Sequence, residues 1–103
     1  MKTIKDLVSS TDKRVYVYLK DEATARQFIA DAELQGYHFA DGVGVSRRKT
    51  DNYYAINRDM TVNFIGLVGR MAFHSKDPQL LRVDYAKYRN GEYDYVIENQ
   101  LLL

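Results

Sequence analysis

The segment Asp21–Gly36, "DEATARQFIADAELQG", carries the pattern that most constrains how this chain folds. Its apolar residues recur at intervals of three and four, which places them on one face of a helix. Asp21 is a preferred N-cap residue, and Gly36 stands where a glycine commonly ends a helix. We therefore predict a helix over residues 21–35 with one buried face. That face comprises Ala25, Phe28, Ile29 and Ala32.

Short runs on both sides of this helix have the composition of strands. Residues 14–20, "RVYVYLK", alternate strictly and are rich in β-branched and aromatic side chains. Residues 53–56, "YYAI", and 61–65, "TVNFI", are predicted to pair as a hairpin around "NRDM". Segment 87–97 is either a hairpin turning at Asn90-Gly91 or the end of a short helix over 85–90. Further strands are predicted at 37–40, 69–75 and 80–85.

The order of these elements, one strand, one helix and then four or five strands, predicts an α+β fold. We expect one domain over residues 1–103, with a mainly antiparallel sheet of about five strands and the helix 21–35 on one face. One helix covers one face only, so the second face is expected to be solvated or to contact another copy. The chain's nine tyrosines and the terminal Leu101–Leu103 favour self-association, as a dimer or a higher homo-oligomer.

Composition argues against several classes of function. The net charge of +1 gives no general electrostatic basis for binding nucleic acid or a membrane. The chain has no cysteine, which excludes thiolate metal sites and nucleophiles and fits a reducing cytoplasm. His38 and His74 lie far apart in sequence, without acidic partners at ligand spacing. We therefore predict a cytoplasmic protein that is not an enzyme and holds no metal or cofactor.

Asn63 is the unusual residue of the predicted hairpin, because asparagine is depleted from strands. Its amide can pair with the N6/N7 edge of adenine, and a nearby aromatic ring could stack on that base. A four-residue loop would place Tyr54 opposite Asn63, whereas a three-residue loop would place Ala55 there and make Tyr53 a diagonal neighbour. The plainer alternative is an exposed Asn63 beside tyrosines that belong to the core.

Arginine side chains near this hairpin supply groups that hold phosphate. A guanidinium binds phosphate through a fork of donors, and Arg70 and Arg82 lie on the segments that follow the hairpin. The long loop 41–52 carries the basic triplet Arg47–Lys49, with Arg48 at its centre. A long loop in a small domain is more often functional than idle. Phosphate capture and a simply solvated basic loop both stay open.

The runs "VYVYLKDEATARQFIADAELQGYHFADG", "SRRKTDNYYAINRDMTVNFIGLVGRMAFH" and "RVDY" resemble small phage proteins of the Thoeris anti-defence 1 family. The resemblance implies an oligomeric signal sponge of an infected bacterial host that sequesters cyclic ADP-ribose-type messengers, and in some members cyclic oligonucleotides of the CBASS system, without cleaving them. It also implies that Tyr53 stacks on adenine, with Tyr54 as its rival, that Asn63 reads the base edge, and that Arg82 completes the pocket.

Two other functions compete with this expectation. A small protein-binding inhibitor or adaptor would act through a tyrosine-rich surface or a sheet edge. A nucleic-acid-binding module would use the basic loop and exposed tyrosines, but the near-neutral charge argues against it. In a pull-down from a host lysate, a sponge should recover no stoichiometric protein partner, whereas an adaptor should recover one.

Overall fold

A five-stranded sheet organises the chain in the computed structural model, which describes residues 3–75 and 77–98. The strand order across the sheet is β2-β4-β3-β1-β5. The strands are β1 (Arg14–Tyr18), β2 (His38–Phe39), β3 (Tyr53–Ile56), β4 (Thr61–Asn63) and β5 (Leu80–Asp84). The described residues also form four α-helices, α1 (Ile4–Ser9), α2 (Glu22–Leu34), α3 (Gly66–His74) and α4 (Tyr85–Arg89), and one 3-10 turn, η1 (Val45–Arg47).

The fold is α+β, as predicted, but the sheet is mixed rather than mainly antiparallel. β3 pairs antiparallel with β1 and β4, whereas β5 pairs parallel with β1 and β2 pairs parallel with β4. A parallel pair needs a crossover connection rather than a tight turn. α3 lies in the connection between β4 and β5. This connection passes β3 and β1, because both strands lie between β4 and β5 in the sheet.

α2 confirms the predicted helix over residues 21–35. The Asp21 carboxylate caps it by accepting a hydrogen bond from the Thr24 backbone N–H at 2.8 Å. Gly36 follows the helix with a φ of 88°, a conformation that glycine adopts without steric cost. The four residues predicted for its inner face, Ala25, Phe28, Ile29 and Ala32, are all buried.

α3 overturns the strand predicted over residues 69–75. The run "GRMAFHS" places apolar Met71 and Phe73 two apart, as in a strand, yet the buried positions are Gly69 and Phe73, four apart. A Cβ on Gly69 would lie 2.5 Å from the Cβ of Ile65, so this helical turn requires a glycine there. The apolar pattern on α3 is therefore helical, with only a narrow face turned inward.

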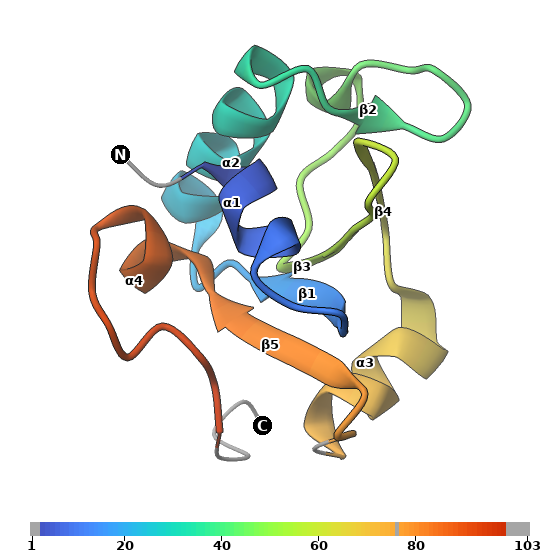
Figure 1. Ribbon diagram of the computed structural model, residues 1–103. Coiled ribbons are helices and arrows are strands. Elements are labelled where there is room, and N and C mark those ends of the chain that lie inside the picture. Colours follow the sequence, from blue (N-terminus) through green and yellow to red (C-terminus); the bar gives the residue numbers. More distant parts are fainter. Residues whose placement is uncertain (1–2, 76, 99–103) are drawn as a thin grey trace.

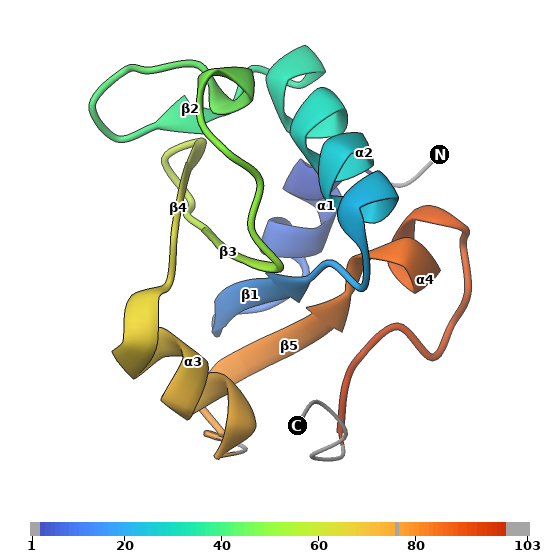
Figure 2. The same cartoon turned by 180° about the vertical axis from the view of Figure 1, so that it is seen from behind.

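The two faces of the sheet are covered by different helices. α1, α2 and α4 pack on one face, where Phe28 lies 5.2 Å from Tyr54 and 5.0 Å from Tyr85 between ring centroids. α3 packs on the second face through Phe73, and Figures 1 and 2 show β1 and β5 lying between α2 and α3. The second face is therefore partly covered, whereas the sequence had suggested that no helix reached it.

The C-terminal region resolves the alternative left open for residues 87–97. α4 ends at Arg89, and Gly91 follows with a φ of 78°, so the Asn90-Gly91 pair closes a helix. The chain then runs back along β5, where the Val96 backbone pairs with Val83. Leu101–Leu103, on which part of the self-association prediction depends, lie outside the described residues. No helix in the described ranges is long and apolar enough to cross a bilayer.

Candidate functional site

A row of four side chains crosses the second face of the sheet, opposite α2. Asn63 pairs with Ala55, Ala55 pairs with Tyr16, and Tyr16 pairs with Arg82. Directly paired residues on neighbouring strands point to the same face, so these four side chains share the second face. Strands lie about 4.8 Å apart, so the row spans roughly 14 Å. We call it the Asn63–Arg82 row.

The hairpin register explains why Asn63 lies on this face. Asn57 donates its backbone N–H to the Thr61 carbonyl at 2.8 Å, which leaves a loop of three residues, 58–60. Met60 closes that loop with a φ of 66°, as the third residue of such loops commonly does. Ala55 therefore lies opposite Asn63, and Tyr53 shares its face, which is the second of the two registers considered for the sequence.

Asn63 lines, with Val8 of α1, a cleft of about 320 Å³ at the end of the sheet. Its Oδ1 accepts a hydrogen bond from Asn57 Nδ2 at 2.8 Å, and its Nδ2 donates to the Phe64 carbonyl at 3.0 Å. A side-chain amide has two acceptor lone pairs and two N–H donors, so one of each remains for a ligand. The cleft is also lined by Tyr16, Arg14, Lys13, Ala55 and Arg58, and by the carboxylate-bearing Asp12.

Tyr16 is the aromatic ring of this cleft. It is half-buried, and the Arg14 guanidinium carbon lies 5.8 Å from its ring centroid. Arg14 is mostly exposed and forms a long ion pair with Asp77, at 3.4 Å. An exposed pair of this kind contributes little to stability, so Arg14 can exchange Asp77 for an anionic ligand at small cost.

The structure places Tyr53 and Arg82 beside the cleft but under α3. Tyr53 is 8% exposed, and its ring centroid lies 5.5 Å from that of Tyr18 and 5.0 Å from that of Phe73. Burial, with Tyr18 nearby, raises the pKa of the Tyr53 hydroxyl. The Arg70 guanidinium carbon lies 4.7 Å from the Tyr53 ring centroid. Arg82 is 5% exposed, and its Nη1 donates to the Phe73 carbonyl at 2.8 Å.

Tyr54 lies on the opposite face of β3, inside the main core. Its side chain is fully buried, with ring centroids 5.2 Å from Phe28 and 5.4 Å from Phe64. Its hydroxyl accepts a hydrogen bond from the Asp51 backbone N–H at 3.2 Å. In this conformation neither face of the Tyr54 ring is open to a ligand.

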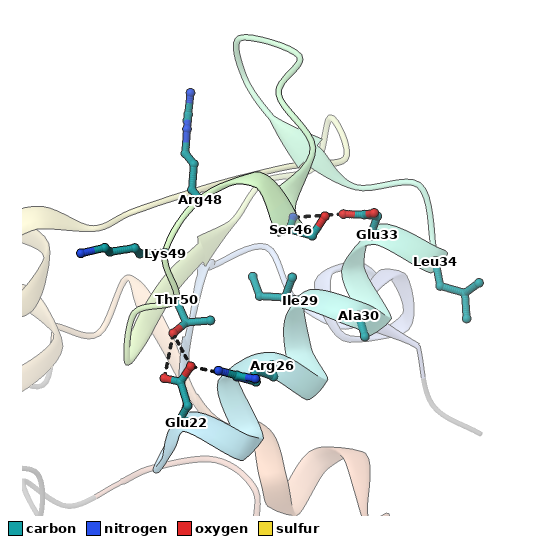
Figure 3. A pocket seen from close by; sticks show the side chains of 10 residues that line it. All are labelled: Glu22, Arg26, Ile29, Ala30, Glu33, Leu34, Ser46, Arg48, Lys49 and Thr50. Atoms are coloured by element: carbon teal, nitrogen blue, oxygen red, sulfur yellow. Dashed lines mark hydrogen bonds and ion pairs between the residues drawn. The ribbon is translucent and has the colours of Figure 1, made fainter.

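Arg48 lines a different and larger hollow, of about 1020 Å³, between α2 and the loop 44–50. The loop is held to α2 at both ends, because Glu33 accepts from the Ser46 N–H and Glu22 accepts from the Thr50 hydroxyl. Figure 3 shows the Arg48 and Lys49 side chains pointing away from α2. Arg48 is paired with Asp41 at 2.6 Å, and the two hollows share no lining residue.

Sequence analysis missed Tyr16 as a candidate, because its nearness to Asn63 depends on the strand order. The alternation in residues 14–20 places Tyr16 and Tyr18 on one face, but it does not show which strand lies beside them. Within the described part of the chain, no group of three or more histidines and carboxylates could hold a metal ion. No family model matches this chain, and no curated protein or solved structure matches it.

Proposed function

We propose that this protein binds an adenine-containing cyclic nucleotide messenger and sequesters it without cleaving it, as a phage-type anti-defence sponge. The candidate ligands are cyclic ADP-ribose isomers and cyclic oligonucleotides. The observation that carries the proposal is Asn63, whose amide has one donor and one acceptor beyond its two hydrogen bonds within the described residues, in a cleft that also holds Tyr16 and Arg14.

These groups correspond to two chemical parts of such a ligand, the base and the phosphates. The Asn63 amide can pair with the adenine edge, and each good bidentate pair of this kind is worth about 1–3 kcal/mol. The Tyr16 ring offers a stacking surface for the base, worth a similar roughly 1–3 kcal/mol. Arg14 and Lys13 offer cationic groups for phosphate.

A second copy of the chain is part of this proposal. The cleft of about 320 Å³ is at the lower end of the range for small-molecule sites and is open to solvent. A cyclic messenger with two or three phosphates would extend beyond it. We therefore propose a homo-oligomer, a dimer or higher, in which a neighbouring copy encloses the exposed part of the ligand.

Asn63→Ala is expected to weaken binding of cyclic ADP-ribose by about 10- to 100-fold, the loss of one bidentate base contact. Asn63 is exposed, so the variant should keep the melting temperature of the native protein within a few degrees. Titration calorimetry of both proteins measures the difference. Asn90→Ala, at the exposed C-cap of α4, is the control and should bind as the native protein does. Equal affinity of Asn63→Ala and the native protein would place the site elsewhere.

A protein-binding inhibitor is the second candidate, and the outer face of α3 favours it. Leu67, Val68 and Met71 are 76%, 80% and 63% exposed and lie on one helix. Exposed apolar groups of this kind often mark protein contacts. This function predicts that a host protein co-purifies stoichiometrically with the native chain and is lost with Val68→Asp. The sponge predicts neither result.

A further inference from the structure

A chain of hydrogen bonds runs from the loop of the hairpin to the Asn63 amide. The pairing of β3 with β4 extends to Asn57 and Thr61, because Asn57 donates its backbone N–H to the Thr61 carbonyl at 2.8 Å. Side chains two residues apart on a strand point to the same face, so Thr61 lies on the face of Asn63. The Asp59 carboxylate, in the loop, accepts from the Thr61 hydroxyl at 2.5 Å and from the Thr61 backbone N–H at 3.2 Å.

The Asp59 carboxylate sets the direction of the bonds in this chain. An ionised carboxylate only accepts hydrogen bonds, so the single hydroxyl proton of Thr61 is directed at Asp59. Thr61 Oγ1 is then left to accept, and it accepts from Asn57 Nδ2 at 3.0 Å. The same nitrogen also donates to Asn63 Oδ1 at 2.8 Å. Both N–H donors of the Asn57 amide are therefore used, and Asn63 must present its oxygen to them.

The Phe64 carbonyl fixes the same orientation of the Asn63 amide from the other end. A backbone carbonyl only accepts, and this one accepts from Asn63 Nδ2 at 3.0 Å. Turning the amide over would set its Nδ2 against the Asn57 donors and its Oδ1 against the Phe64 oxygen. Two hydrogen bonds would then become two repulsive contacts. The amide is therefore held with its acceptor toward Asn57 and its donor toward Phe64.

We propose that this chain makes the cleft select purines with a 6-amino group over purines with a 6-oxo group, with Asp59 as a positioning residue. The inference rests on the proposed function, because it specifies which base Asn63 reads. Adenine presents a donor at N6 beside an acceptor at N7 or N1. Hypoxanthine and guanine present an acceptor at O6 instead, beside the N7 acceptor or a protonated N1. An amide held in the orientation that adenine needs therefore sets its Oδ1 against O6.

The cations of the cleft keep a 6-oxo purine from binding in a reversed pose. Such a base could reverse the order of its edge groups by turning over, which would move its ribose and phosphates to the other side of Asn63. Lys13 and Arg14, the groups proposed for phosphate, lie at the start of β1 and so to one side of Asn63. A mobile amide would avoid the conflict by turning over itself. The selectivity therefore depends on the chain that holds Asn63.

NMR relaxation of the side-chain amides tests the held orientation without any ligand. In the native protein, the order parameter of Asn63 Nδ2 is expected to approach the roughly 0.85 of rigid backbone, whereas that of Asn90, at the exposed C-cap of α4, should lie below about 0.6. Thr61→Val removes the hydroxyl but keeps a branched side chain that strands favour, and it should lower the Asn63 value. A native Asn63 amide as mobile as that of Asn90, or one unaffected by Thr61→Val, overturns the proposal.

The ratio of two affinities tests the selection itself, and it cancels any general loss of stability in a variant. Cyclic tri-adenylate, or the cyclic ADP-ribose isomer that binds, is titrated by calorimetry beside its inosine analogue. The native protein is expected to bind the adenine compound about 10- to 100-fold more tightly. Thr61→Val should narrow this ratio by about three- to ten-fold, the worth of one hydrogen bond. Thr50→Val is the matched control and should keep the native ratio, because its hydroxyl also donates to a carboxylate, that of Glu22, but outside the cleft.

The outcomes separate this inference from the proposed function. Equal affinity of the native protein for the two compounds, or an unchanged ratio in Thr61→Val, overturns selection by the hydrogen-bond chain and leaves the sponge intact. No binding of any cyclic nucleotide, together with a rigid Asn63 amide that Thr61→Val loosens, refutes the sponge and keeps the held orientation of Asn63.

Discussion

Phe28→Ala is expected to lower the free energy of unfolding by about 3–5 kcal/mol, as large-to-small changes of buried aromatic residues do. Phe28 is fully buried on α2 and joins the helix to both the sheet and α4. Its ring makes a tilted contact with Tyr54 of β3 and an edge-to-face contact with Tyr85 of α4. The variant therefore loses buried apolar area and two aromatic contacts. It also leaves a cavity that the neighbouring side chains fill only in part.

Urea denaturation at neutral pH measures this loss. Leu34→Ala is the control on the same helix, since Leu34 is 88% exposed, and it should change the free energy of unfolding by less than about 0.5 kcal/mol. A Phe28→Ala protein as stable as the Leu34→Ala protein would contradict the assignment of Phe28 to the core between α2, β3 and α4.

Asp31→Ala is expected to cost about 2–3 kcal/mol at neutral pH, because it removes the acceptor of three hydrogen bonds. The Asp31 carboxylate accepts from the Tyr85 hydroxyl at 2.5 Å, from Arg89 Nε at 2.9 Å and from Gln27 Nε2 at 3.1 Å. Burial acts to raise the pKa of Asp31, but the hydrogen bonds from Arg89, Tyr85 and Gln27 outweigh it and hold the pKa below its usual value. The carboxylate thus connects α2 to α4 in its charged form.

The sign of this pKa shift fixes how the cost depends on pH. A carboxylate with a lowered pKa in the folded state stabilises the fold above its unfolded pKa of about 3.9, and that contribution is lost as the pH falls through the folded value. Urea denaturation of the native protein and Asp31→Ala should therefore show a large difference at pH 7 that shrinks below pH 4. Asp12→Ala, which removes an exposed carboxylate, is the control. An equal difference in the free energy of unfolding at pH 7 and below pH 4 would contradict the claim that Asp31 connects α2 to α4 in its charged form.

The sequence predicted the local elements of this fold better than their arrangement. The helix 21–35, the strand at 14–20 and the hairpin followed from caps and apolar periodicity, which are properties of short segments. α3 was mistaken for a strand because Met71 and Phe73 alternate, and only the close approach of Gly69 to Ile65 shows the helical turn. The parallel pairing of β1 with β5 depends on the path of a crossover, which no local pattern records.

The candidate site was predictable to a similar extent. The chemistry of Asn63 and its position in a hairpin were readable from the sequence, and the structure places it exposed on the second face. Tyr16 was not readable as its neighbour, because they are two strands apart and the strand order was unknown. Tyr53 and Arg82 are on the same face but lie under α3, which a strand assignment for that segment could not foresee.

We propose that the chain holds an intact cyclic nucleotide. Titration calorimetry of the native protein with cyclic ADP-ribose isomers, and separately with cyclic tri-adenylate, measures binding. The protein is then heated, and the released ligand is identified by mass spectrometry. We predict saturable, stoichiometric heat with at least one of these compounds and release of that compound with unchanged mass. No heat with any of them, or release of a cleaved product, would contradict the claim.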